Sequence, residues 1–148
     1  ELILLGKGNP ESMKVIDGIR SMDCVHYLGF VSDEELIHQM QESDLLCMTR
    51  CNSRFANYGF PFKLSEYLAT GNLVLATNVG DVCDFVKDKE GALVIPSEDS
   101  KAIADAIQYA IENPAEALRI GNGGYEVMQN SFSVESVGKT FVNFLKNL

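Results

Sequence analysis

The chain has 148 residues, of which 46% are hydrophobic, so it is about one domain long and can bury a continuous core. Its formal net charge of −9 argues against nucleic acid or an anionic membrane face as a general partner, so any phosphate group must be bound by a local set of donors. The sequence contains no signal-peptide pattern and no apolar stretch of about 18 residues.

The four cysteines lie in or beside apolar runs, and no Cys-x-x-Cys pair occurs among them: Cys24, Cys47, Cys51 and Cys83. This placement is typical of reduced thiols in the core of a cytoplasmic protein. A metal site built from these cysteines with His26 and His38 is an alternative, but paired-histidine spacing is missing as well. We therefore expect no metal ion.

Short apolar runs punctuated by glycine alternate with amphipathic stretches along most of the chain. This alternation is typical of parallel strands joined by crossover helices. We expect one α/β domain over residues 1–148, with a Rossmann-like, doubly wound parallel sheet and a helical C-terminal tail. Residue 1 already lies inside the first apolar run, which indicates a fragment of a longer protein.

In the first part of the chain, helix starts are marked by capping residues. Pro10 occupies an expected first helical position after a turn at residues 6–9. Ser32 and Glu35 form a capping-box pattern, with Ser32 as the N-cap and Glu35 reaching back. The elements expected here are strands at 1–5, 25–28 and 45–48 and helices at 10–20 and 32–41.

The second part begins with the longest expected loop, a polar and irregular segment at residues 49–60. No strand signal remains after residue 97. Pro114 and Ser133 mark helix starts in the tail, and the glycines of 121–124 are expected to break a helix. The other elements expected here are strands at 73–76 and 92–95 and helices at 61–70 and 81–86.

Ligands of open α/β sheets bind beyond the carboxyl ends of the strands. The loops after Leu5, Leu28, Met48 and Ala76 are therefore the candidate ligand-binding loops. The strongest candidate is the loop that leads into the helix beginning at Pro61.

The first turn of that helix has the features of an anion site. The amides of Phe62, Lys63 and Leu64 are expected to lack intrahelical acceptors. Lys63 and Glu66 share one helical face and are free to meet a ligand, while Leu64 and Leu68 point to another face that would pack on the sheet. The alternative is an ordinary surface ion pair between Lys63 and Glu66.

The whole run Gly59-Phe-Pro-Phe-Lys-Leu-Ser-Glu-Tyr-Leu-Ala-Thr-Gly-Asn-Leu-Val-Leu-Ala76 resembles the signature of the group 1 glycosyltransferases, the retaining family 4 with the GT-B fold. Three further segments match the same family in order: Leu4-Leu-Gly-Lys-Gly8, Val25-His-Tyr-Leu-Gly-Phe-Val31 with Glu35-Leu36, and Gly91-Ala-Leu-Val-Ile-Pro96. The resemblance covers essentially the entire chain.

The resemblance implies the C-terminal, nucleotide-sugar-binding half of a GT-B enzyme, without the N-terminal acceptor domain and the strand that precedes residue 1. It implies that Glu66 binds the ribose hydroxyls, that the first amides of the helix and Lys63 hold the diphosphate, and that backbone groups near Gly29 border the base. The expected donor-binding residues are Gly29, Phe30, Val31, Arg50, Tyr58, Gly59, Phe60, Pro61, Phe62, Lys63, Leu64 and Glu66.

One position departs from the family pattern. The signature places a glutamate that contacts the donor sugar eight residues before Glu66, where this chain has Tyr58. Relatives that build surface polysaccharides lack that glutamate and carry an arginine after the third strand, as Arg50 stands here. Arg50, followed by Arg54 and Asn57, is therefore a candidate for donor contacts and phosphate stabilisation, with solvated loop residues as the alternative.

Two other patterns favour structural roles. Gly6-Lys7-Gly8 lacks the third glycine of a dinucleotide fingerprint, because position 11 is Glu11, so an NAD site is not expected. Asp81 and Asp84 follow Gly80 near the expected mouth of the sheet, but Asp81 is better explained as the N-cap of a short helix.

The resemblance thus implies a retaining glycosyltransferase that moves a hexose-type sugar from a nucleotide-diphosphate donor to a carbohydrate or lipid-linked acceptor, in polysaccharide or glycoconjugate biosynthesis. No metal or other cofactor is expected, and no catalytic residue is assigned within this chain, which alone should bind donor without turnover. We expect a cytoplasmic protein, with peripheral association at the inner face of the membrane left open. The alternatives are a noncatalytic glycosyltransferase-like interaction module and an epimerase sharing the GT-B architecture.

Overall fold

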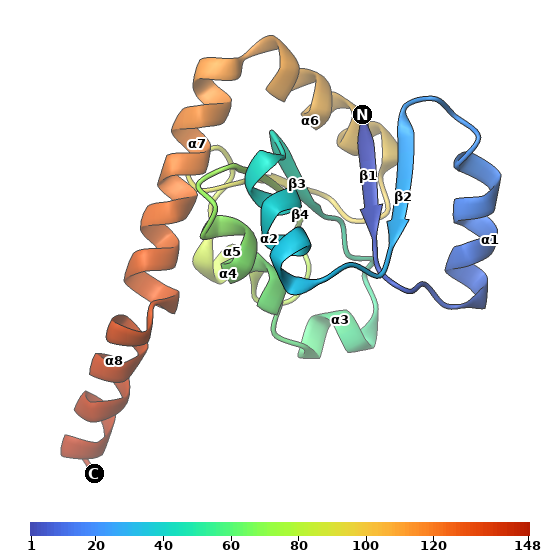
Figure 1. The fold of residues 1–148 in the computed structure, drawn as a ribbon. Coiled ribbons are helices and arrows are strands. Elements are labelled where there is room, and N and C mark those ends of the chain that lie inside the picture. The colour runs from blue at the N-terminus through green and yellow to red at the C-terminus, as the bar shows by residue number, and fades with distance from the viewer. The chain divides into compact units, whose positions relative to one another are not determined.

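The computed structural model describes all residues from 1 to 148 and divides into two units, Glu1–Glu42 and Ser43–Leu148. Figure 1 gives the order of the elements along the chain. All five expected strands are present and every strand pair is parallel, but the strands form a two-stranded sheet in unit 1 and a three-stranded sheet in unit 2.

Unit 1 consists of β1 (Leu2–Leu5), α1 (Pro10–Ile19), β2 (Val25–Gly29) and α2 (Asp33–Glu42). Asn9 caps α1, because its Oδ1 accepts from the Ser12 amide at 2.8 Å while the Ser12 hydroxyl accepts from the Asn9 amide at 2.8 Å. At α2 the Ser32 hydroxyl accepts from the Glu35 amide at 3.2 Å. The Glu35 carboxylate accepts from Gln39 instead of closing the capping box, so half of that expectation is confirmed.

The sheet of unit 2 has the order β3 (Leu45–Met48), β4 (Leu73–Thr77) and β5 (Leu93–Ile95). All five residues of the central strand β4 are buried. The cluster that packs on this sheet combines residues from β4, β5, α6 (Ser100–Glu112) and α7 (Pro114–Val127): Leu73, Leu75, Leu93, Ala106 and Ile120. The continuous apolar runs of the sequence are therefore explained by burial of the central strand.

The segment expected to be an irregular loop contains a short helix, α3 (Arg54–Tyr58). Ser53 caps it by accepting from the Ala56 amide at 3.1 Å, and Ala56 is buried. It is followed by α4 (Phe62–Leu68) and, after β4, by α5 (Val82–Phe85). The expectation of an irregular segment was wrong because a helix this short is stabilised by tertiary contacts that local sequence patterns do not reveal.

The cysteines are all free, as expected, but none of them lies in the core. Each is exposed, including Cys47, which lies within β3. The expectation of core thiols was wrong because an apolar run in a short strand buries alternate residues, and Leu46 and Met48 take the buried positions next to Cys47.

The glycines of residues 121–124 do not break the helix, since α7 runs through them to Val127. They are the contact face of α7. A Cβ at Gly121 would collide with the carbonyl oxygen of Gly71, and a Cβ at Gly124 would lie 2.5 Å from the carbonyl oxygen of Gly91. The expected break was wrong because these glycines are required for close approach of the helix to two turns, a use of glycine that the sequence does not distinguish from a break.

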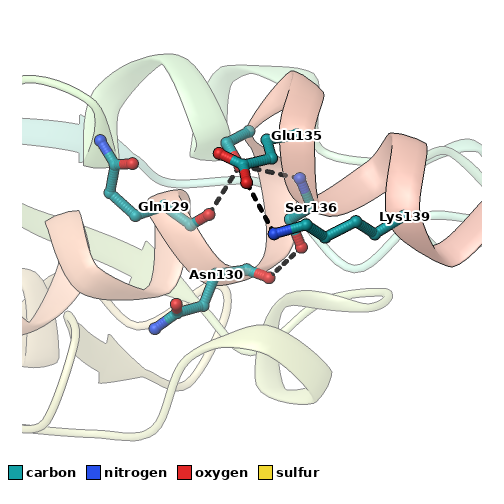
Figure 2. Close-up of polar contacts among 6 residues, drawn as sticks. Gln129, Asn130, Glu135, Ser136 and Lys139 are labelled. Carbon is teal, nitrogen blue, oxygen red and sulfur yellow. Dashed lines mark hydrogen bonds and ion pairs between the residues drawn. The ribbon is translucent and has the colours of Figure 1, made fainter.

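After α7 the chain forms a π-helical turn, η1 (Met128–Phe132), and then α8 (Val134–Lys146), which in Figure 1 extends away from the sheet of its own unit. The Ser133 hydroxyl accepts from the Ser136 amide at 3.1 Å and donates to the Gln129 carbonyl at 2.7 Å. Figure 2 shows Ser136 donating to the Asn130 carbonyl and Lys139 paired with Glu135. These bonds confirm the helix start expected at Ser133. No helix in the structure is both long enough and apolar enough to cross a membrane.

The glycine face of α7 gives a direct test of this packing. Gly121→Ala should destabilise the protein by about 1–3 kcal/mol, because the added methyl group forces backbone apart in a close-packed contact. Gly138→Ala is the matched control, since Gly138 lies within α8 and has nothing within 4 Å of an added Cβ. The control should be stabilising by about 0.5–1 kcal/mol through helix propensity. Urea unfolding of both variants measures the difference, and a Gly121→Ala protein as stable as wild type would contradict the close approach.

Candidate functional site

The loops that follow β3 and β4 are tied together in two places, the first of them through Thr77, the buried last residue of β4. Its Oγ1 accepts from the Arg50 amide at 2.9 Å and donates to the Arg50 carbonyl at 2.8 Å. A second link between the same two loops runs from the Gly80 amide to Oδ1 of Asn57, at 3.3 Å. The carboxyl ends of the two strands therefore form one edge, which is where an open α/β sheet binds its ligand.

Arg50 lies at this edge with only part of its hydrogen-bonding capacity used. Nη2 donates to the carbonyl oxygen of Gly59 at 3.2 Å. Nη1 is inaccessible to solvent and has no hydrogen-bond partner. The side chain belongs to none of the ion pairs of the chain.

Helix α3 presents two aromatic rings to solvent. Ala56 anchors the helix on its buried side, and Asn57 is fixed by its bond from Gly80 and by a 2.7 Å bond to the side chain of Asn52. Phe55 and Tyr58, three residues apart on one face, are each 86% exposed. Tyr58 therefore stands at the surface, on a helix that is held firmly from the other side.

The turn into α4 uses more of its amides than the sequence suggests. The Phe62 amide donates to the carbonyl oxygen of Phe60 at 3.0 Å, and the Leu64 amide donates to that of Pro61 at 2.8 Å. The expectation of three free amides is therefore wrong for two of them, because the chain tightens into short-range turn bonds before the helix begins. The Lys63 amide makes no such bond, and α4 has only seven residues.

The division of α4 into two faces is confirmed. Leu64 and Leu68 are completely buried, while Lys63 and Glu66 are both exposed. Lys63 and Glu66 belong to none of the chain's ion pairs, so the surface pair considered as the alternative is not formed. Burial raises the pKa of the Tyr67 phenol, and the charges of Cys47 and Glu66 add to this increase.

An aromatic cluster behind this turn was not anticipated from the sequence. The ring of Phe60 lies 5.1 Å from that of Phe62, 5.7 Å from that of Phe85 and 5.9 Å from that of Phe132. Phe85 and Phe132 are 4.7 Å apart. These residues belong to the α4 turn, α5 and the π-helical turn, so contacts between distant segments support the loop that precedes Lys63.

In unit 1 the loops after its two strands lie together. Gly29 has φ 69° and its carbonyl oxygen accepts from the Gly6 amide at 2.7 Å. The ammonium of Lys7 lies 4.9 Å from the centroid of the Phe30 ring, which is 74% exposed. Gly29 and Phe30, expected to border a nucleotide base, thus belong to one exposed ridge at the carboxyl ends of β1 and β2, with Val31 directly after it.

The remaining candidate residues and surfaces do not belong to the expected donor-binding set. Asp81 occupies the N-cap position of α5 without a side-chain capping bond, so its expected capping contact is missing. An open groove of about 530 Å³ runs between the ends of β4 and β5, but it contains none of the expected donor-binding residues: Asn78, Cys83, Asp88, Val94, Ile95, Pro96 and Ser97. No group of three or more histidine, cysteine, aspartate or glutamate side chains gathers at any point of the chain.

Comparison with solved structures supports the architecture. HepE of Anabaena, solved in complex with UDP-glucose, matches with a TM-score of 0.80 at 22% identity, over 99% of this chain and 40% of that one. The C-terminal domain of a group 1 family glycosyl transferase, LpcC, from Francisella tularensis matches with a TM-score of 0.69 at 18% identity, over 84% of this chain and 62% of that one. The fold is therefore the Rossmann-like architecture of GT-B glycosyltransferase domains.

Sequence comparison identifies the family. The phosphatidyl-myo-inositol mannosyltransferase of Mycobacterium leprae (strain TN) is 25% identical over 129 residues, which are 87% of this chain and 33% of that protein. This chain thus spans about a third of the length of that relative. The sequence profile of the family described as Glycosyl transferases group 1 matches residues 2–127, a region that includes both loops of the edge described above. The chain belongs to the group 1 glycosyltransferases.

Proposed function

We propose that the protein carrying this chain transfers a hexose-type sugar from a nucleotide-diphosphate sugar to an acceptor, with retention of the anomeric configuration, and that residues 1–148 are its C-terminal, donor-binding half. Family membership supports sugar transfer, and HepE was solved with a nucleotide sugar. The match to a C-terminal domain in LpcC supports the position in the protein. The observation that carries donor binding is that Lys63 and Glu66 lie exposed and unpaired on one face of α4.

In this proposal Glu66 recognises the ribose. Its carboxylate has two acceptor oxygens, which suit the two hydroxyl groups of a diol. Glu66 is the only aspartate or glutamate on α4. Glu66 is therefore the acidic side chain on this helix that is available as an acceptor.

Lys63 contributes positive charge toward the diphosphate. When the bond from the anomeric carbon to the phosphate oxygen breaks, its electron pair stays with the departing nucleoside diphosphate, and a nearby ammonium stabilises that charge. The chain as a whole is acidic, so this stabilisation must come from a few correctly placed cations. The acceptor, a carbohydrate or lipid-linked sugar in polysaccharide or glycoconjugate biosynthesis, is assigned to the part of the protein outside this chain.

The first prediction concerns binding itself. UDP, GDP or ADP, or one of their sugars, should raise the melting temperature of the protein, because a ligand that binds only the folded state stabilises it by mass action, by about 2.7 kcal/mol at one hundred times its dissociation constant. Thermal unfolding with a millimolar panel measures this. A panel without any shift would contradict donor binding and would favour a noncatalytic interaction module.

The second prediction concerns metal dependence. The shift caused by the nucleoside diphosphate should be the same in EDTA and in magnesium, since basic side chains supply the positive charge in this proposal. The same thermal-unfolding assay gives the answer. A shift that EDTA abolishes and magnesium restores would show that a metal ion, rather than Lys63, carries the interaction with the phosphates.

The third prediction assigns the ribose. Glu66→Ala should fold normally and bind the nucleoside diphosphate about ten- to a hundredfold more weakly, because each hydrogen bond to a charged group contributes about 1.5–3 kcal/mol. Affinity for the free nucleobase should change much less. Glu126→Ala, an exposed glutamate of α7 outside every ion pair, is the matched control. Calorimetric dissociation constants that are equal for wild type and Glu66→Ala would exclude the ribose contact.

A further inference from the structure

The open groove at the carboxyl ends of β4 and β5 has no part in the donor-binding proposal. Asn78 directly follows β4 and Pro96 directly follows β5, and both residues line the groove. Ligands of open α/β sheets bind beyond this edge of the sheet. The groove volume of about 530 Å³ lies within the range of about 300–1,000 Å³ that is usual for small-molecule sites. Its position and size are therefore those of a binding site.

The polar side chains at this groove are held in place by the strands around them. The Asn78 amide donates to the carbonyl oxygen of Ile95 at 2.9 Å, which ties the residue after β4 to β5. Oδ1 of Asp88 accepts from the Val94 amide at 2.9 Å, at the edge of the sheet of unit 2, because β5 is its last strand. The thiol of Cys83, in α5, donates to Oδ1 of Asn78 at 3.0 Å. These side chains are thus positioned before a ligand binds.

Three polar groups that line the groove keep hydrogen-bonding capacity that the chain does not use. Nδ2 of Asn78, Oδ2 of Asp88 and the hydroxyl of Ser97 have no hydrogen-bond partner within the protein. They offer the donors of an amide, the acceptor of a carboxylate and a hydroxyl group that serves as either. The rest of the lining is mostly apolar and includes Ile95 and Pro96. A lining with an apolar wall and a few polar groups is typical of small-molecule sites.

Charge decides which kind of ligand suits this lining. Asp88 is the only charged residue that lines the groove, and the ammonium of the next residue, Lys89, lies over the ring of Tyr109, 4.3 Å from its centroid. A phosphate group would therefore meet a carboxylate without a cation to offset the repulsion. A neutral molecule with several hydroxyl groups and apolar C–H faces suits both parts of the lining, and sugar rings have this composition. The family to which the chain belongs transfers sugars.

We propose that this groove binds a neutral sugar ring of the carbohydrate acceptor. The proposed function assigns the acceptor to the part of the protein outside this chain, and the groove adds a contact for it on the chain itself. Ring hydroxyl groups bond to Oδ2 of Asp88 and to the hydroxyl of Ser97, while C–H groups of the ring pack on Pro96. Because a hydroxyl bound to a carboxylate makes a charge-assisted hydrogen bond, Asp88 contributes most of the affinity. The inference rests on the sugar transfer of the proposed function, but not on the donor contacts of Lys63 and Glu66.

The thiol of Cys83 gives a direct readout of occupancy, because it is exposed and lines the groove. The experiment follows its alkylation by iodoacetamide, using mass spectrometry, with the methyl glycosides of glucose, galactose, mannose and N-acetylglucosamine as probes. At least one glycoside should slow the alkylation about tenfold at ten times its dissociation constant, since the thiol reacts only when the groove is free. Cys24 is the matched control, an exposed thiol of unit 1 whose alkylation rate should not change.

Two substitutions test the assigned contacts without removing a bond of the fold. Asp88→Asn keeps an Oδ1 for the Val94 amide but loses the charged acceptor, so protection of Cys83 should need at least about tenfold more glycoside. Ser97→Ala removes a hydroxyl without a partner in the protein, and protection should need about two- to tenfold more glycoside. Asp84→Asn is the control with the same change of charge, at an exposed aspartate of α5 outside the groove.

The outcomes separate this inference from donor binding. If no glycoside protects Cys83, or if UDP, GDP, ADP or their sugars protect it and no free glycoside does, the inference is wrong. If a glycoside protects Cys83 in a protein that binds no nucleoside diphosphate, the inference stands and donor binding fails. Equal protection of wild type and both variants would overturn the contacts assigned to Asp88 and Ser97. If Asp88→Asn does not fold, Ser97→Ala decides by the same measurement.

Discussion

The contact between the glycine face of α7 and two backbone turns holds unit 2 together. Gly121 lies against the turn at Gly71, which ends α4 and begins β4, and Gly124 lies against Gly91 and the side chain of Leu68. A helix that approaches this closely excludes water from the backbone and fixes both turns at once. Since Leu68 belongs to α4, the same contact sets how α4 is turned about its own axis. The exposed face with Lys63 and Glu66 follows from that rotation.

Helix α7 also supports the N-terminal end of α4, through the π-helical turn that follows it. The π-helical turn after α7 carries Phe132, whose ring packs with those of Phe60 and Phe85. Phe60 immediately precedes Pro61 and α4. Both ends of α4 are therefore supported by one continuous helical segment, at Gly71 through backbone contact and at Phe60 through aromatic contact. Rigid support of this kind is what a site needs if its charged side chains are to remain in place without being paired to each other.

Much of the fold could be predicted from the sequence because its signals are local. Apolar runs identified all five strands, and Pro10, Ser32 and Ser133, which the sequence marked as helix starts, lie at helix starts in the structure. The errors concern features that depend on distant residues. Helix α3 is held by Ala56 and by the Asn57 bond to Gly80, and the Phe62 and Leu64 amides of α4 are used by turn bonds to Phe60 and Pro61, beside the contact of the Phe60 ring with Phe85. Neither effect appears in a local pattern.

For the candidate site, the sequence identified the residues but not which of them are paired or enclosed in the structure. The spacing of Lys63 and Glu66 placed them on one face, yet it could not exclude the ion pair that the structure lacks. Arg50 was a candidate only by its place after the third strand, and its enclosed and unpartnered Nη1 is a property of three dimensions. Tyr58 is a further case, because its side chain is exposed on the same face of α3 as Phe55, so the position where the family signature has a glutamate is open to solvent in this chain.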